Sequence, residues 1–560
     1  MDAEAPTNKA VTGEITQARE PSVYEDDLDK PQAPARMQTQ RHLRSRHVQL
    51  MAIGGAIGIG LFVGIGVTLT RAGPIALLVG YIVYGLGYIW PLCLAVGEMT
   101  AWLPIRGSIF EMATRFVHPS FGFAMGWTYF YSATMLVCTE YSAVATVMQY
   151  WNTSVNPAVW IAMAMVVCLF LNLVGVRWYG ESEFVMSSTK ILLLVGLMLV
   201  TFITMCGGNP NGDAYGFRNW VDGNAFREYH SSGDLGRFLA FFVSFRYAVF
   251  TVGGPDYISL SAGEIQNPRR VVPRVAKLIV WRIVGFYVLG VAFLGIICNS
   301  QDPTLISAIE DSRPGAAASP WVVGIKNVGI HGFLPGLINF LILLSGWSCG
   351  NAFLYTSSRT LYSLAQDGQA PKVFLRCTKH GIPWVCVVVV SLISCITFLV
   401  SSNAALEVFL WFVDLTTSGL IVNQTAMFLT FLGWYRALKR QGIDRHALPY
   451  RAPLAPYVQI FGLILGVLGI LFIGFDRFAP FTARGFITSY FGIFWAMGLF
   501  IFWTVFKRTR FVNPETADVY GGKAEIDAEC RVWEEGGLEE NEKRRLAGMN
   551  VMRRTWEKMW

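Results

Sequence analysis

The sequence predicts an all-helical protein that crosses a membrane many times, and two observations support this. The first is composition: of the 560 residues 53% are hydrophobic and only 15% are charged, whereas a soluble domain carries about 25% charged residues. The second is that apolar residues gather into runs of about 20, the length of a helix that spans the bilayer. Disordered, collagen-like and small disulfide-linked chains are excluded by the same composition.

Twelve such runs follow one another between two polar ends. They lie at about 48–70, 75–101, 121–151, 158–176, 185–206, 238–262, 277–299, 333–358, 384–401, 404–434, 457–475 and 486–506. The predicted membrane domain is therefore 48–508. Residues 1–47 contain no apolar stretch suited to a signal peptide, so we expect a disordered tail. Residues 509–560 have mixed charge and predict a second tail, solvated or partly helical.

Charges in the connecting loops predict the orientation in the membrane. Taken alternately, the loops on one side hold 22 Lys and Arg residues and those on the other hold eight. Positively charged loops are typical of the cytoplasmic side, so both termini are expected to be cytoplasmic. The net charge of +7 is explained by this asymmetry. The expected partner is therefore the lipid bilayer, and no nucleic acid is expected.

Glycine and proline interrupt two of the runs. The first run contains Gly54 to Gly60, and the sixth contains Val252 to Asp256 with Pro255 in it. Paired interruptions in corresponding halves indicate a substrate site on broken helices. Unwound backbone inside the membrane offers amide and carbonyl groups that lipid cannot satisfy. Small residues at helix contacts are the alternative for the first run, but proline removes a helix hydrogen bond beside a carboxylate and favours a site.

Ionisable residues within the runs are further candidates, because charge at this depth is costly and is commonly functional or paired. Glu140 lies in the middle of the third run and Asp256 just past the second interruption, so each could contact a substrate or carry a proton. Arg246 lies one turn before Phe250. It could recognise an acidic side chain, or it could pair with Asp256 or Glu140. Glu98 is expected to pair with another helix.

Motifs of other chemistries do not occur in the sequence. It has no phosphate-binding loop, no nucleophile elbow and no His-Glu-x-x-His metal motif. The ten cysteines lie mostly inside apolar runs and form no Cys-x-x-Cys pair. We therefore expect neither an enzyme nor a metal or cofactor.

Seven short stretches form a recognisable series along the chain. They are Gly54–Phe62, Gly97–Ser108, Gly126–Tyr129, Gly180–Phe184, Ala262–Arg269, Ser357–Lys372 and Leu448–Pro453. In content and order the series resembles that of the fungal amino-acid permeases, in the amino acid–polyamine–organocation superfamily. The resemblance covers about residues 41–510 and leaves both tails unmatched.

This resemblance implies a leucine-transporter-like fold. Its five-plus-five inverted repeat would occupy about 48–206 and 238–434, with helices 1 and 6 broken and two peripheral helices at about 457–506. It also implies proton-coupled import of L-amino acids across the plasma membrane by alternating access, with the proton as coupling ion. An amino-acid-sensing receptor on the same fold is the alternative. Trafficking or ubiquitination machinery would meet such a protein through its tails.

The resemblance also implies which groups hold the substrate. Amides of the first break would meet the substrate carboxylate and carbonyls of the second its ammonium, as suits helix ends. These groups belong to Gly58, Ile59 and Gly60, and to Phe250, Thr251 and Val252, respectively. The family often has a hydroxyl residue where Ile59 stands and an aromatic gate where Val252 stands. The amino acid transported is therefore left open, and acidic amino acids are included.

Lys190, in the fifth run, is the residue to which the resemblance gives proton coupling. The family places a lysine here, against the break in the first helix, where related sodium-coupled carriers hold their cation. Its ammonium group could hold helices 1 and 5 together when protonated and release them when neutral. A structural lysine bound to a helix-end carbonyl is the alternative. Glu140 and Asp256 are the other candidate proton carriers.

Overall fold

The computed structural model describes residues 57–105, 108–174, 176–221, 225–253, 268–310, 319–379, 381–401, 404–535 and 544–550. These residues are mainly helical and contain no β-sheet. Nine helical stretches among them are long and apolar enough to cross a membrane. An all-helical, multi-pass membrane protein is confirmed for the described part of the chain.

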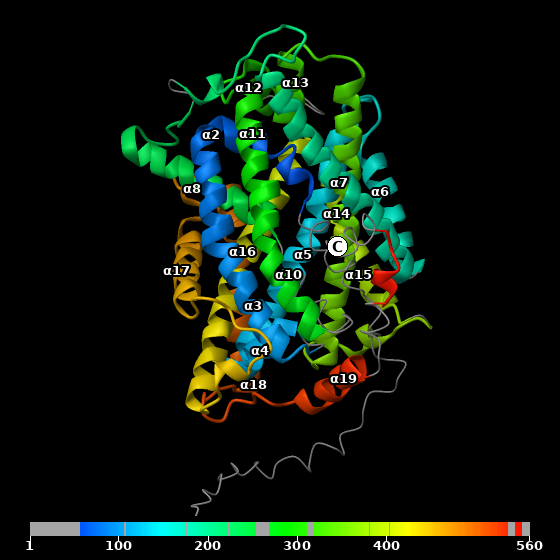
Figure 1. The fold of residues 1–560 in the computed structure, drawn as a ribbon, viewed down its shortest axis with the longest axis vertical. Helices are drawn as coiled ribbons and strands as arrows, with labels where there is room; N and C mark the ends of the chain where they lie inside the picture. Colours follow the sequence, from blue (N-terminus) through cyan, green and yellow to red (C-terminus); the bar gives the residue numbers. More distant parts are fainter. Residues whose placement is uncertain are drawn as a thin grey trace, which may run out of the picture.

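The helices form the bundle drawn in Figure 1. In chain order they are α2 (Ile65–Tyr84), α3 (Trp90–Trp102), α4 (Ser108–Phe116), α5 (Pro119–Met148), α6 (Pro157–Val174), α7 (Val176–Met205), α8 (Gly233–Thr251), α10 (Pro268–Arg282), α11 (Leu289–Ile297), α12 (Pro303–Glu310), α13 (Pro320–Asn327), α14 (Phe333–Gln366), α15 (Trp384–Ser394), α16 (Ala405–Arg440), α17 (Tyr457–Phe472), α18 (Ala483–Lys507) and α19 (Lys523–Glu535).

Each of the twelve predicted runs overlaps a helix, but the count of twelve crossings stays a prediction. The first two runs share the continuous stretch Ile65–Trp102, which turns at Gly73, where φ is 78° in front of Pro74. The fifth run, 185–206, matches the apolar stretch Val185–Met205, which is the later part of the longer helix α7. Helices α5 and α8 are not among the nine apolar stretches. Most of α5 is buried against protein, so it can carry polar residues that a lipid-facing helix cannot.

The central helices are α5, α14 and α16, which pack against one another, while α2 packs against α8. Helices α17 and α18 lie at the periphery, and α18 exposes large apolar side chains such as Phe494 and Phe502. In a membrane protein such a surface faces lipid. Two π-helical segments, η3 (Gly85–Ile89) and η5 (Ile283–Val288), lie in contact between α2 and α3 and between α10 and α11.

Loops expected on the same side of the membrane do lie together. On one side the Ile75 amide donates to the Ala225 carbonyl at 2.9 Å, and Arg227 Nη1 donates to the Ser300 carbonyl at 3.3 Å. On the other side Arg445 Nη2 lies 2.7 Å from Glu98 Oε1. This grouping agrees with the alternation of the loops that the sequence predicts.

The C-terminal segment, residues 509–535, packs against the bundle at several points, although many of its side chains are exposed. Trp102 Nε1 donates to the Val519 carbonyl at 3.2 Å, Arg115 Nη1 to that of Gly521 at 2.8 Å, and Gln441 Nε2 to that of Ala517 at 2.8 Å. Helix α19 crosses this end of the molecule, near α4 (Figure 1). Part of this region is helical, as predicted, and part of it is exposed. Residues 1–47 lie outside the described residues.

Candidate functional site

The two predicted breaks come together at the centre of the bundle. Gly58 is extended, residues Ile59–Leu61 form a 3₁₀ turn named η2, and α2 begins only at Ile65. Helix α8 ends at Thr251, after which Val252 is extended. In the described residues, α2 therefore begins only after the first glycine interruption, and α8 ends as the second one begins. Asp256 lies outside the described residues.

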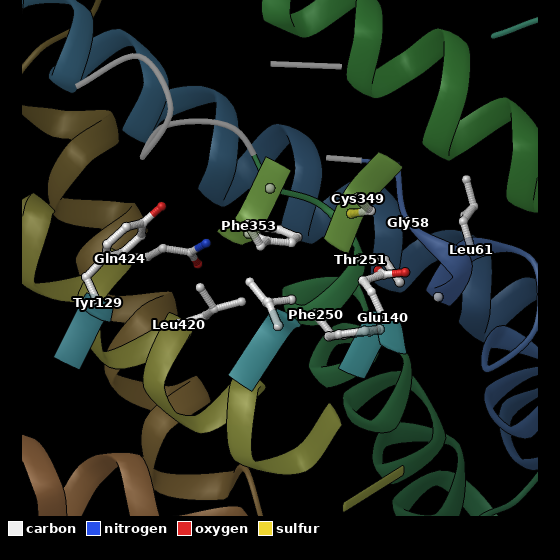
Figure 2. Close-up of a pocket in the computed structure, with 13 residues that line it drawn as sticks. Gly58, Leu61, Tyr129, Glu140, Phe250, Thr251, Cys349, Phe353, Leu420 and Gln424 are labelled. Carbon is white, nitrogen blue, oxygen red and sulfur yellow. The ribbon is translucent and has the colours of Figure 1, made fainter. Parts of the chain in front are cut away.

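A small cavity, here called the central pocket, lies between the two breaks. Its volume is about 30 Å³, and its wall consists of Gly58, Gly60, Leu61, Tyr129, Leu136, Glu140, Phe250, Thr251, Gly253, Cys349, Phe353, Leu420 and Gln424. Figure 2 shows Glu140, Thr251 and Cys349 beside Gly58, and Tyr129 and Gln424 at the other end of the view. A volume of this size holds about two water molecules and no amino acid, so substrate binding requires the pocket to widen.

Side chains of neighbouring helices bind the carbonyl groups that the first break frees. The donors are Ser345 Oγ to Ile57 (3.2 Å), Tyr247 OH to Gly60 (2.9 Å), Trp321 Nε1 to Leu61 (3.4 Å) and Ser319 Oγ to Phe62 (2.8 Å). Backbone groups buried without partners are costly, so these bonds stabilise the unwound turn. The fold therefore stabilises the first break through specific hydrogen bonds.

Glu140 takes part in the first break directly. The Ile59 amide donates to Glu140 Oε2 at 3.3 Å. A Cβ atom added to Gly58 would lie only 2.1 Å from Glu140 Oε1, so the close approach requires glycine. The amide that the family resemblance assigns to a substrate carboxylate is thus occupied by a carboxylate of the protein. Two carboxylates cannot share this amide while both are ionised.

Gly60 and Ile59 are also in close contact with neighbouring helices. A Cβ atom on Gly60 would lie 2.5 Å from Phe250 Cε1, on α8. On the other side, a Cβ atom on Gly346 would lie 2.1 Å from Ile59 Cδ1. The Gly60 backbone therefore lies close to the Phe250 ring of α8, and the α14 backbone at Gly346 lies close to the Ile59 side chain.

Lys190 lies next to this region, on α7, and its side chain is completely buried. Its charge acts on Glu140 and also on Glu183. Glu183 Oε1 accepts hydrogen bonds from Ser348 Oγ at 2.8 Å and from Ser187 Oγ at 3.2 Å. Lys190 therefore lies in the field of two buried carboxylates.

Sequence reasoning missed Glu183 as a site residue, although a signal was present. Residues 183, 187 and 190 fall on one face of a helix, because they are spaced by four and three. On this face Glu183 and Lys190 are two helical turns apart, within or just before an apolar run. A buried lysine needs such a neighbour.

Arg246 lies away from the central pocket. Its Nη1 atom is 3.0 Å from Asp476 Oδ1 and donates to the Ile473 carbonyl at 3.0 Å. The observed ion-pair partner of Arg246 is therefore Asp476 and not Glu140. Asp476 follows the end of a predicted apolar run, and sequence spacing gave no link between the two residues.

Glu98 and Asp414 have structural partners. Glu98 is completely buried and receives a bidentate bond from Arg445, with Nη2 at 2.7 Å and 2.9 Å from its two oxygens. Asp414 pairs with Arg477 at 2.9 Å. The predicted helix pairing of Glu98 is confirmed. These bonds satisfy charges whose burial would otherwise be costly.

A pocket between the start of one membrane helix and the end of another, lined by main-chain groups and a buried carboxylate, is typical of a transport protein for a small polar solute. The chain belongs to the amino acid permease family, whose family model matches residues 47–513. This match confirms the resemblance that the seven sequence stretches carry. It also places the protein among transporters and not among enzymes.

Several relatives are similar over most of their length. A proline-specific permease of Emericella nidulans is 40% identical over 518 residues, which cover 91% of this chain and 92% of the relative. A proline-specific permease of Saccharomyces cerevisiae is 39% identical, covering 88% and 80%. The dicarboxylic amino acid permease of the same yeast is 34% identical, covering 98% and 90%.

Proposed function

We propose that the protein imports L-amino acids across the plasma membrane together with protons, by alternating access, with both termini cytoplasmic. The observation that carries this proposal is the bond from the Ile59 amide to Glu140, beside the buried Lys190. A protonatable group of the protein occupies the amide that the substrate needs. Proton binding and substrate binding are then linked at one atom.

The linkage follows from charge. While Glu140 is ionised it holds the Ile59 amide, and a second carboxylate is repelled. When Glu140 takes up a proton its hold on the amide weakens, and the substrate carboxylate can bind there. After the substrate leaves on the other side, loss of the proton restores the first arrangement. Protonation of Glu140 would remove one of the two negative charges near Lys190 and leave that of Glu183. The environment of Lys190 would therefore change with the protonation of Glu140. Asp256 remains a second candidate proton carrier.

We place this mechanism on the five-plus-five inverted repeat, with helices 1 and 6 broken. The contact between α2 and α8 and the paired π-helical segments η3 and η5 support this arrangement. In it the two segments belong to the second helix of each repeat. No cofactor is involved besides the proton, and trafficking or ubiquitination machinery remains a proposed partner of the tails.

For the substrate we favour a small neutral amino acid, with L-proline first. Within the described part of its wall, the central pocket has Glu140 as carboxylate and no arginine or lysine. Most of the remaining wall is apolar or neutral, such as Leu136, Phe353 and Gln424. Two relatives are named as proline-specific permeases. Acidic amino acids are the second candidate, supported by the dicarboxylic relative and requiring Arg246 to leave Asp476.

Uptake of radiolabelled L-proline by cells without amino-acid permeases of their own tests the proposal. One proton moving through 100 mV supplies about 2.3 kcal/mol, which supports about a fortyfold gradient before any pH difference is added. We expect accumulation that a protonophore abolishes. A competition panel of twenty amino acids ranks proline against glutamate and aspartate. Binding without accumulation would identify a receptor, and uptake unchanged by the protonophore would refute proton coupling.

A further inference from the structure

A second cavity, here called the outer cavity, shares helices α8 and α16 with the central pocket but has a different wall. Its volume is about 180 Å³, larger than that of the central pocket. It lies between α2, α8, α16 and the turn after α17. Its wall includes Arg71, Arg246, Tyr247, Trp411, Asp414 and Arg477.

The outer cavity lies beside the central pocket, toward the 207–237 loop. On α8, Arg246 precedes Phe250 of the central pocket, and on α16 Asp414 precedes Leu420. Tyr247 joins the two cavities: it lines the outer one, and its hydroxyl donates to the Gly60 carbonyl in the wall of the central one. A solute that arrives from this side therefore meets the outer cavity first.

Positive charge is in excess around this cavity. Arg246 pairs with Asp476 at 3.0 Å and Arg477 with Asp414 at 2.9 Å. Arg71 forms no salt bridge with a carboxylate among the described residues, although its charge acts on Asp476 from a greater distance. Its guanidinium lies 5.7 Å from the centre of the Tyr229 ring. The wall itself holds three arginines, Arg71, Arg246 and Arg477, and two carboxylates, Glu407 and Asp414. Two ion-pair partners outside the wall, Asp476 and Arg484, cancel each other, so the charge in excess is that of Arg71. A site of this charge attracts an anion.

A hydrogen-bond donor of Arg477 in the wall of the outer cavity also lacks an acceptor. Arg477 Nε is buried yet donates no hydrogen bond to any residue that the structure describes. Its distance to Asp476 Oδ1 is 3.6 Å, too long for one. A buried donor without an acceptor is costly, and an anion in the cavity would supply the acceptor.

We propose that the outer cavity binds the carboxylate group of an incoming amino acid, anchored by Arg71, before the amino acid reaches the central pocket. The inference rests on the proposed function, since it assumes amino-acid import from this side. A guanidinium offers two parallel donors that match a carboxylate. Asp414 and Glu407 line the same cavity and can attract the ammonium group. The outer cavity would thus attract substrates by charge, and the central pocket would then select among them.

The first test separates the two sites by removing the central one. In the purified full-length Gly58→Val protein, the added side chain fills the space of Glu140, and binding of radiolabelled L-proline should persist only weakly, at the outer cavity. The further change Arg71→Gln should weaken this residual binding about tenfold, the effect of losing one charge-assisted hydrogen bond. Arg218→Gln, at an exposed arginine outside the cavity on the same side, should leave it unchanged.

Competitors then identify the chemical group that is bound. N-acetyl-L-proline keeps the carboxylate without the ammonium group and should displace the residual label, whereas L-prolinamide, without the carboxylate, should not. A folded Gly58→Val protein without residual binding would overturn the proposal. So would residual binding that Arg71→Gln does not change, or that chloride displaces and N-acetyl-L-proline does not.

Transport kinetics give a second test that needs no altered central pocket. Arg71→Gln alone should raise KM for L-proline about tenfold and leave the maximal rate within twofold, with Arg71→Lys in between. If the wild type imports L-proline and Arg71→Gln has an unchanged KM, the outer site is refuted while the proposed function stands. If the wild type does not import L-proline, the substrate proposal fails, and the same variants are measured with the amino acid that wins the competition panel.

Discussion

The central pocket and the outer cavity share helices α8 and α16, yet they use opposite chemistry. The central pocket has main-chain groups, apolar side chains and Glu140, whereas the outer cavity has arginines and aspartates. Helix ends carry only partial charges, which cost less to bury than full ions. Full charges act over a longer range and suit a region that faces water. The difference indicates that attraction and selection of the substrate occur at separate places.

The largest effect should come from closing the central pocket. Gly58→Val places a side chain where Glu140 Oε1 lies 2.1 Å from the Cβ position, so uptake should fall more than a hundredfold, and Gly60→Val should act similarly against Phe250. Surface labelling checks that the variant reaches the membrane. Gly498→Val, at a glycine of α18 with open space around it, is the matched control. Normal uptake by a surface-expressed Gly58→Val protein would refute the site.

Next in size is the loss of coupling without loss of binding. Lys190→Met removes the buried charge that acts on Glu140 and Glu183, so accumulation should fall to equilibrium and lose its pH dependence while L-proline still binds. Accumulation ratios at several external pH values measure this. Lys326→Met, at an exposed lysine of α13, should behave as the wild type. Wild-type pH dependence in Lys190→Met would show that Lys190 takes no part in proton coupling and would leave it to Glu140 or Asp256.

A smaller effect is expected from Arg246. Arg246→Gln leaves Asp476 without its nearest cation, and breaking a buried ion pair costs about 3–5 kcal/mol, so thermal stability should fall and uptake of proline and glutamate should fall equally. Asp476→Asn in the same protein should restore part of the stability, and Arg237→Gln on the exposed part of α8 should change neither quantity. A loss confined to glutamate would instead support the prediction that Arg246 selects acidic substrates.

The smallest effect is expected far from both cavities, in the C-terminal segment. Burial alone would raise the pKa of Asp527, but hydrogen bonds from Lys523 and Arg269 lower it below the usual value. A carboxyl group with a lowered pKa stabilises packing above the usual value of about 3.9, and this contribution is lost as the pH falls through the lowered pKa.

Asp527→Asn should therefore reproduce the acidic state at neutral pH. Faster hydrogen exchange of residues 509–535 would show the weaker packing, with uptake nearly unchanged. Glu525→Gln, at an exposed position of the same helix, is the control. An equal change in exchange for both variants would assign the effect to general loss of charge. Strong loss of uptake would show that this end of the molecule also takes part in transport.

The sequence predicted those parts of the site that depend on local chemistry. Glycine marked the first break at Gly58, and depth in an apolar run marked Glu140 and Lys190, because charge is rare there. Apolar runs predicted the helices, and the fifth run matches the apolar stretch Val185–Met205 within α7.

The remaining parts depend on long-range pairing, which spacing does not encode. Asp476 reaches Arg246 across 230 positions, and Arg477 reaches Asp414 across 63. Packing of the C-terminal segment was not predicted for the same reason, since its hydrogen-bond partners Trp102, Arg115 and Gln441 come from three distant loops and helix ends.

The paired π-helical segments have a consequence for the ancestry of the chain. A π turn holds one residue more than an α turn and is rare in helices. Here one occurs in each proposed repeat, and the two touch, since a Cβ atom on Gly85 would lie 2.5 Å from Ile283 Cγ2. If a single unit of five helices was duplicated to form this protein, the irregularity was already present in that unit. Two copies that first associated as separate chains would then have met at this same pair of turns.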